Sequence, residues 1–141
     1  MVTRGNPHKI RGVSDLAKKH VRMVNREPGA ALRTLLDDRL ALSGIPARRG
    51  PGYRTLVSNH EEGAQMVLHG LADAALGLRA VASAFGIDFV TLETVRCDIV
   101  IPDDMMEHQA VRVMLDVLQT RALRDELASL PGYDPRDTGK V

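Results

Sequence analysis

The chain has 141 residues, with 19 basic and 18 acidic side chains and a formal net charge of +1. This length suits one domain with a sizeable core, and the balanced charge excludes a general attraction to nucleic acid or to an anionic membrane. Aromatic residues make up only 3% of the chain and Trp is absent, so we expect an aliphatic core, as in parallel sheets covered by helices.

Strand-like and helix-like patterns alternate along the chain. Ser, Asn and Asp precede the predicted helices and Gly follows several of them, as is typical of helix caps. In chain order the patterns predict the end of a strand at residues 2–3, a helix at 14–20, a strand at 21–24, a helix at 29–43, a strand at 53–57, a helix from 58 to about 70, a strand at 72–76, a helix at 79–85, strands at 89–92 and 93–101, and a helix at 105–129.

The sequence also predicts how two of the helices end. Gly44 is expected to end its helix in the left-handed conformation, and a polar loop over residues 46–52 follows. The last helix is expected to kink or break near Gln119-Thr120, before a polar, turn-rich tail over residues 131–141. The alternation predicts an α/β fold with a mostly parallel, doubly wound sheet, because successive parallel strands need a crossover helix.

Cys97 is the only cysteine, which excludes an internal disulfide and fits a reducing, cytoplasmic compartment. Its alternating apolar neighbours predict a buried structural thiol rather than a nucleophile. The sequence shows no signal peptide and no apolar run long enough to span a bilayer, so we expect no membrane contact. The first 33 residues are locally basic, and we expect them to form a solvated surface rather than a DNA-binding patch.

Three predicted strand ends lead directly into helix starts. In open α/β sheets ligands bind beyond the carboxyl ends of the strands, and each helix start offers unpaired N–H groups with a partial positive charge. Gly29 lets a ligand approach the backbone, and nearby arginines can bind an anion in a bidentate way. The pattern predicts a site for an anion or a polar small molecule, formed by Asn25, Arg26, Gly29, Ala30, Ala31, Arg33, Ser58, His60, Gly77, Leu78 and Arg79.

Plainer roles are open for single residues of this set. His60 suits a capping position, and Asp37 lies one turn after Arg33, where it is an alternative ion-pair partner. The five histidines show no metal-ligand spacing, and there is no P-loop, Gly-x-Ser-x-Gly elbow or nucleophile–base pair. We therefore expect neither an enzyme nor a resident metal or cofactor.

Several motifs follow one another over nearly the whole chain: Arg-Gly-Asn-Pro at 4–7, Ile-Arg-Gly at 10–12, Asp-Leu-Ala at 15–17, Val-Asn-Arg-Glu-Pro-Gly-Ala-Ala-Leu-Arg at 24–33, Leu-Leu-Asp at 35–37, Gly-Leu-Ala-Asp-Ala-Ala-Leu-Gly-Leu-Arg-Ala at 70–80, Gly-Ile-Asp-Phe at 86–89, Asp-Ile-Val-Ile-Pro at 98–102, and Gly-Tyr-Asp at 132–134 with Thr-Gly at 138–139. Together they resemble the periplasmic-binding-protein-like (PBP-like) domain found in molybdopterin biosynthesis proteins and in helix-turn-helix regulators related to molybdate control.

The resemblance implies a type 2 PBP-like second lobe with hinge strands over residues 1–141, and an absent first lobe, because the chain begins at what looks like the crossover strand. It also implies molybdate or tungstate as the ligand and a fused helix-turn-helix or molybdopterin-biosynthesis domain as the partner. In the family the stretch after Asn-Arg usually runs Gly-Ser-Gly-Thr-Arg, whereas residues 29–33 here are Gly-Ala-Ala-Leu-Arg. The hydroxyls expected to contact an oxyanion are therefore absent, while the arginine and the backbone N–H groups remain.

Three hypotheses follow. The first is a sensory ligand-binding module for a small anion, which passes its signal to a fused domain when a cleft closes. The second is a structural or oligomerisation module that has lost its ligand, favoured by the missing hydroxyls and by an uncovered cleft face that promotes homo-oligomers. The third is an enzyme subunit in molybdenum-cofactor assembly, which the lack of a catalytic constellation disfavours.

Overall fold

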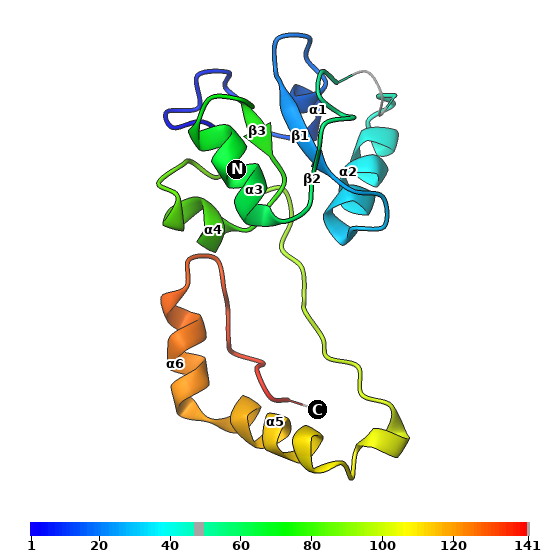
Figure 1. The fold of residues 1–141 in the computed structure, drawn as a ribbon, viewed down its shortest axis with the longest axis vertical. Coiled ribbons are helices and arrows are strands. Elements are labelled where there is room, and N and C mark those ends of the chain that lie inside the picture. Colours follow the sequence, from blue (N-terminus) through cyan, green and yellow to red (C-terminus); the bar gives the residue numbers. More distant parts are fainter. Residues whose placement is uncertain (47–49, 141) are drawn as a thin grey trace. The chain divides into compact units, whose positions relative to one another are not determined.

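A computed structural model of the chain describes residues 1–46 and 50–140 (Figure 1). The chain divides into two compact units, Met1–Glu93 and Thr94–Val141, and each is described by itself. Residues 47–49 of the predicted loop and residue 141 of the predicted tail lie outside the described residues. No helix of the described residues is both long and apolar enough to cross a membrane.

The first unit contains a small parallel sheet with helices around it, so the predicted α/β class is confirmed. Its three strands are ordered β2-β1-β3, and β1 pairs in parallel with both neighbours. The strands are β1 (Met23–Arg26), β2 (Leu56–Val57) and β3 (Ala74–Ala75). The helices are α1 (Val13–Leu16), α2 (Ala31–Leu42), α3 (His60–Leu68) and α4 (Arg79–Ala84).

The sheet is buried on both faces. Neighbouring residues of a strand point to opposite faces, and here Met23 and Ala74 enter one core cluster while Val24 and Ala75 enter the other. The first cluster includes Leu36 of α2, and the second includes Ala64 and Val67 of α3 and Ala82 of α4. Helices therefore cover both faces, as right-handed crossovers on either side of a central strand require, and the buried residues are mostly aliphatic as expected.

The predicted helices of the first unit are largely confirmed. α2 ends where Gly44 has a φ of +66°, and Asn59 caps α3 by accepting a hydrogen bond from the Glu62 amide. The first helix is shorter than predicted, since α1 ends at Leu16 rather than at residue 20. β1 begins two residues later than predicted and includes Asn25 and Arg26.

Several predicted strands are wrong. Val2 forms only isolated bridges, to Ala74 and Asp88, and the strand predicted at 53–57 is reduced to Leu56–Val57. The segments 89–92 and 93–101 contain no strand. Their alternating apolar pattern is compatible with a strand, but a strand also needs a paired neighbour to accept and donate its backbone hydrogen bonds. Cys97 lies in this extended stretch and is exposed, so the prediction of a buried thiol is wrong as well.

The second unit is helical, with a short 3₁₀ turn η2 (Asp103–Met105) before α5 (Gln109–Gln119) and α6 (Arg121–Ser129). The predicted long helix from residue 105 thus begins later, and the expected break occurs at Thr120. The Thr120 hydroxyl accepts a hydrogen bond from the Leu123 amide at 3.2 Å and donates one to the Val117 carbonyl at 2.7 Å. The Thr120 side chain therefore ends α5 and caps α6. Neither helix has a buried residue.

An ion pair joins the amino ends of β1 and β3. The Asp73 side chain, 9% exposed, accepts two hydrogen bonds from the Arg22 guanidinium, at 2.8 and 3.1 Å, and one from the Arg22 amide at 2.7 Å. These bonds hold the pKa of Asp73 below its usual range. His8 Nε2 lies 3.4 Å from the same carboxylate.

We expect Asp73→Asn to lower the free energy of unfolding by about 2 kcal/mol, because it removes the negative charge and replaces one acceptor oxygen by a donor that faces the Arg22 guanidinium. Because the pKa of Asp73 is lower in the folded state, its contribution is complete above the unfolded pKa of about 4 and is lost as the pH falls towards the folded value. Urea unfolding at several pH values measures both effects. Asp125→Asn, in an exposed pair on α6, is the control and should change stability by less than about 0.5 kcal/mol. An equal loss in both variants would contradict this assignment.

Candidate functional site at the carboxyl edge of the sheet

Parallel strands end at the same edge of a sheet, and the helices that follow them begin there. β1 ends at Arg26, β2 at Val57 and β3 at Ala75, and α2, α3 and α4 start within a few residues of these ends. The residues predicted from the sequence to bind a ligand all belong to these strand ends and helix starts. This carboxyl edge is where open α/β sheets place their ligands.

Arg26 is the centre of this edge. Its guanidinium donates from Nη2 to the Ser58 carbonyl at 2.8 Å and to Glu27 at 3.3 Å, and Nη1 lies 3.5 Å from Nδ1 of His60. The side chain is only 14% exposed. Among the described residues, its Nε is the one buried side-chain nitrogen or oxygen without a hydrogen-bond partner. Because an unpaired buried donor is costly, this N–H is the one group of Arg26 that still lacks an acceptor among the described residues.

His60 is the first residue of α3 and lies beside Arg26. Burial, and then the positive charge of Arg26, lower the pKa of His60, while Glu61 opposes the shift. His60 is not the cap of its helix, because Asn59 has that role. The contact joins the ends of β1 and β2.

A tight turn leads from β1 into α2. The Ala30 amide donates to the Glu27 carbonyl at 3.2 Å, and Gly29, at the third position of this turn, has a φ of +93°. This is a type II turn, which requires glycine there. A Cβ at Gly29 would meet nothing within 4 Å, so the backbone is open at this point. Ala31 and Leu32 begin α2, and their amides lie in the first turn, where a helix has no internal acceptor.

Arg33 is held by the protein and is not free to bind a ligand with its whole guanidinium. Its Nε donates to Asp37 at 3.1 Å and to the Tyr53 hydroxyl at 3.2 Å, and Nη1 donates to the Arg26 carbonyl at 2.9 Å. The guanidinium carbon lies 4.3 Å from the centre of the Tyr53 ring. The alternative partner Asp37 is thus confirmed, and Arg33 positions the end of β1 rather than the ligand.

Asn25 and Ser58 also serve the scaffold. Asn25 is fully buried; its side chain donates to the Tyr53 carbonyl at 3.3 Å and accepts from the Arg26 amide at 2.9 Å. The Ser58 amide donates to the Glu62 carboxylate at 2.6 Å, so it is not available to an anion. Within α3 the amides of His60 and Glu61 occupy the first turn, which leaves them as the available donors.

The start of α4 stands apart from this cluster. Arg79 donates to the Thr91 hydroxyl at 2.5 Å and its guanidinium carbon lies 5.5 Å from the centre of the Phe89 ring. Leu78 stands at the N-cap position of α4 without a side-chain cap, and a Cβ at Gly77 would displace the end of the Met1 side chain that packs there. In the part of the chain that the structure describes, no hydrogen bond joins Arg79 to Arg26, Arg33 or His60.

Sequence reasoning missed one residue that shapes this edge, Tyr53. The Tyr53 hydroxyl accepts from Arg33 and donates to Asp37 at 2.7 Å. Asp37 was visible as an ion-pair partner of Arg33 from its spacing, but Tyr53 is 20 residues from Arg33 and no local pattern connects the two. The only feature of the sequence that singled out Tyr53 was the rarity of tyrosine, since the chain has only two.

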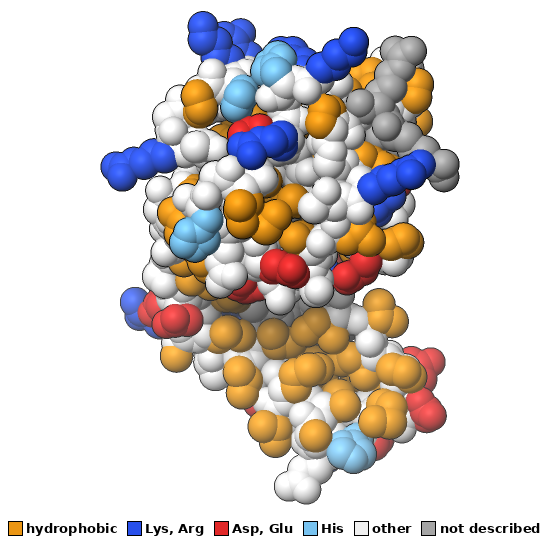
Figure 2. Space-filling view, turned by 45° about the horizontal axis from the view of Figure 1, so that its top comes forward, with side chains coloured by type: hydrophobic (Ala, Val, Ile, Leu, Met, Phe, Trp, Pro, Cys, Tyr) orange, Lys and Arg blue, Asp and Glu red, His pale blue; other side chains and the backbone are white. Residues whose placement is uncertain are grey.

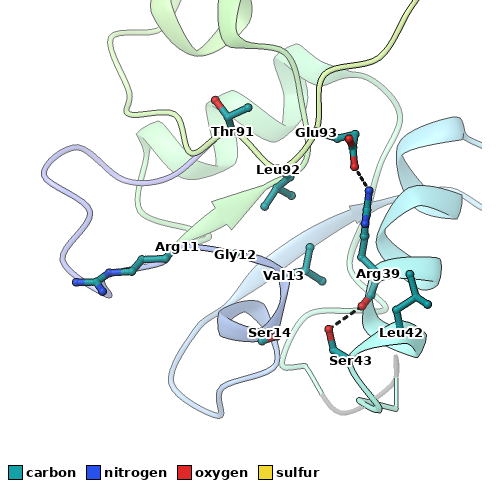
Figure 3. Close-up of a pocket in the computed structure, with 10 residues that line it drawn as sticks. All are labelled: Arg11, Gly12, Val13, Ser14, Arg39, Leu42, Ser43, Thr91, Leu92 and Glu93. Atoms are coloured by element: carbon teal, nitrogen blue, oxygen red, sulfur yellow. Dashed lines mark hydrogen bonds and ion pairs between the residues drawn. The ribbon is translucent and has the colours of Figure 1, made fainter.

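A hollow in the surface of the first unit lies elsewhere. Its volume is about 540 Å³, and it is lined by residues of α1, of the end of α2 and of segment 91–93 (Figure 3). Arg39 pairs with Glu93 within it, and the Arg11 side chain points away from that pair. The ion pair neutralises Arg39, so this hollow lacks a converging set of free donors. Among the described residues no group of three or more His, Cys, Asp or Glu could hold a metal ion.

Comparison with known proteins points to one family. The sequence model of the PBP superfamily domain matches residues 1–119. The uncharacterised protein YvgK of Bacillus subtilis is 34% identical over 140 residues, which are 99% of this chain and 45% of YvgK, so the chain spans less than half of that relative. An uncharacterised protein from the 5′ region of a 2Fe-2S ferredoxin gene of Clostridium pasteurianum is 32% identical over 108 residues, 76% of this chain and 96% of that protein. No solved structure matches the chain significantly.

We expect Tyr53→Phe to destabilise the first unit by about 1.5 kcal/mol, because it removes the hydroxyl that joins Arg33 to Asp37. Thermal and urea unfolding followed by circular dichroism measure the change. Tyr133→Phe is the matched control, since Tyr133 is 45% exposed and should give a change below about 0.5 kcal/mol. A neutral Tyr53→Phe would show that the hydroxyl does not support the carboxyl edge.

Proposed function

The chain belongs to the PBP superfamily domain family, and on that premise we propose that it is a ligand-binding module for a small anion. The anion binds at the carboxyl edge of the sheet, where β1 and β2 end. Arg26, the amides at the start of α2 and those at the start of α3 supply the contacts.

The observation that carries this proposal is the state of Arg26. Its guanidinium is largely buried, is held in place by the Ser58 carbonyl, and retains an Nε–H without a partner among the described residues. A fixed guanidinium loses little conformational freedom when it binds an oxyanion, and its bond to an anionic acceptor is charge-assisted. The starts of α2 and α3 add backbone N–H donors and a partial positive charge, which reinforces the positive charge of Arg26.

Molybdate or tungstate is the ligand that we propose, on the motifs that resemble molybdenum-related PBP-like domains. The missing Ser and Thr hydroxyls at residues 30 and 32 leave backbone N–H groups as the donors that remain there. We further propose a cytoplasmic, non-enzymatic sensory role as a type 2 second lobe. Its signal would pass to a helix-turn-helix or molybdopterin-biosynthesis domain, and a wholly bound anion would need a second lobe to cover it.

We expect Arg26→Gln to weaken the binding of molybdate and tungstate at least tenfold, which corresponds to about 1.4 kcal/mol. Isothermal titration calorimetry and the shift in melting temperature with added anion measure it. Arg54→Gln is the control, because Arg54 is exposed and precedes β2, at the opposite edge of the sheet. No heat and no stabilisation of the unsubstituted protein with either anion would contradict the proposal.

A second candidate function is association. In the second unit, taken by itself, large apolar side chains are exposed on α5 and before it, and Figure 2 shows hydrophobic side chains gathered on this unit. Val113 and Val117, four residues apart on α5, are 55% and 48% exposed. Contiguous exposed apolar surface is typical of an interaction site, which favours an oligomerisation module.

If the second candidate is correct, sedimentation velocity should show association that increases with protein concentration. The double change Val113→Glu with Val117→Glu should then shift the protein to monomer, because two carboxylates would have to be buried in the interface. Leu42→Glu, at an exposed leucine of α2, is the control and should leave the association unchanged. Oligomers whose sedimentation does not change when molybdate is added would favour this candidate over the sensor. A monomer at all concentrations would exclude it.

A further inference from the structure

The contact between Arg26 and His60 places two basic side chains side by side at the proposed site. Nη1 of Arg26 lies 3.5 Å from Nδ1 of His60. When Nδ1 faces an N–H donor it must accept, so the neutral imidazole carries its proton on Nε2. A protonated His60 would instead place a second positive charge against the guanidinium, which costs free energy in a partly buried position.

The other charged groups near His60 do not relieve this conflict. Glu61, on the same helix, favours the charged imidazole, but the combined effect of burial and Arg26 outweighs it. Glu27 contacts the Nη2 of Arg26, and Glu62 is hydrogen-bonded to the Ser58 amide. Arg33 directs its Nη1 to the Arg26 carbonyl, and Asp37 balances the charge of Arg33.

We propose that the Arg26–His60 pair selects a divalent oxyanion and binds it together with one proton, which His60 takes from solvent. This inference rests on the proposed anion site and adds the charge of the ligand and the role of His60. Because Glu27 already pairs with Arg26, a monovalent anion adds little charge for His60 to balance and gives little reason for His60 to become protonated. A dianion attracts both the Arg26 guanidinium and a protonated His60. These two attractions offset the repulsion between the two cations.

Proton linkage gives the sign of the effect. Without a ligand the pKa of His60 lies below its usual value of about 6.5, and a bound dianion raises it. Between these two pKa values the complex holds a proton that the free protein lacks, so affinity increases as the pH falls, by at most about tenfold per pH unit. The gain ends below the lower pKa and is absent above the higher one.

The test is calorimetry of the full chain with sodium molybdate and sodium sulfate, and with sodium nitrate as the monovalent comparison. Titrations near neutral pH in two buffers of different ionisation enthalpy give the number of protons taken up per anion bound. Titrations from about pH 6.5 to about pH 8 give the slope of affinity against pH. His60→Gln keeps hydrogen-bonding capacity without titration, and His69→Gln, at the exposed end of α3, is the matched control.

We expect proton uptake with molybdate and sulfate that disappears in His60→Gln and persists in His69→Gln, with weaker, pH-independent binding of nitrate. Dianion binding without proton uptake, or uptake that survives His60→Gln, would overturn the inference and leave the anion site standing. Equal binding of nitrate would overturn the selection for divalent charge. If none of the anions binds, the proposed function itself fails.

Discussion

The carboxyl edge of the sheet depends on two successive hydrogen bonds, each donated by an arginine guanidinium to a backbone carbonyl. Arg33, fixed by Asp37 and Tyr53, donates to the carbonyl of Arg26, and Arg26 in turn donates to the carbonyl of Ser58. Each bond crosses from one strand end or helix to the next, so β1, the start of α2 and the start of α3 are held as one surface. Charge-assisted bonds in a partly buried position are stronger than neutral ones and resist rearrangement. These bonds fix the positions of both arginines without a ligand, which suits the anion site that we propose.

The parts of this arrangement that follow from local rules could be predicted from the sequence. The leucine stripe of α2, the Asn59 cap and the Gly44 terminus each reflect a few neighbouring residues. Because parallel strands end at one edge of the sheet, the sequence also predicted that Arg26 and His60 lie close together. The partners of Arg33 and of Arg79 could not be predicted, because Tyr53 and Thr91 are distant in the sequence and only the packed core fixes their positions.

The strand predicted at 93–101 failed for a related reason. Alternation of apolar and polar residues shows that a segment would suit a half-covered sheet, but it does not show that a neighbouring strand exists. Without one, the segment containing Cys97 and Val100 stays extended and exposed. The same exposed apolar character extends to α5, which the PBP superfamily domain match includes up to residue 119. Family membership therefore covers both units, while the anion chemistry rests on the first.

The central claim is that anions bind where β1 and β2 end. Titration of isotope-labelled protein with molybdate, followed by amide and arginine Nε–H NMR signals, tests this directly. The account predicts that shifts concentrate at Gly29, Ala31, Leu32 and His60 and at Nε of Arg26, with the lining of the hollow around Arg39 unaffected. Signals that do not move at the carboxyl edge, or shifts confined to that hollow, would contradict it.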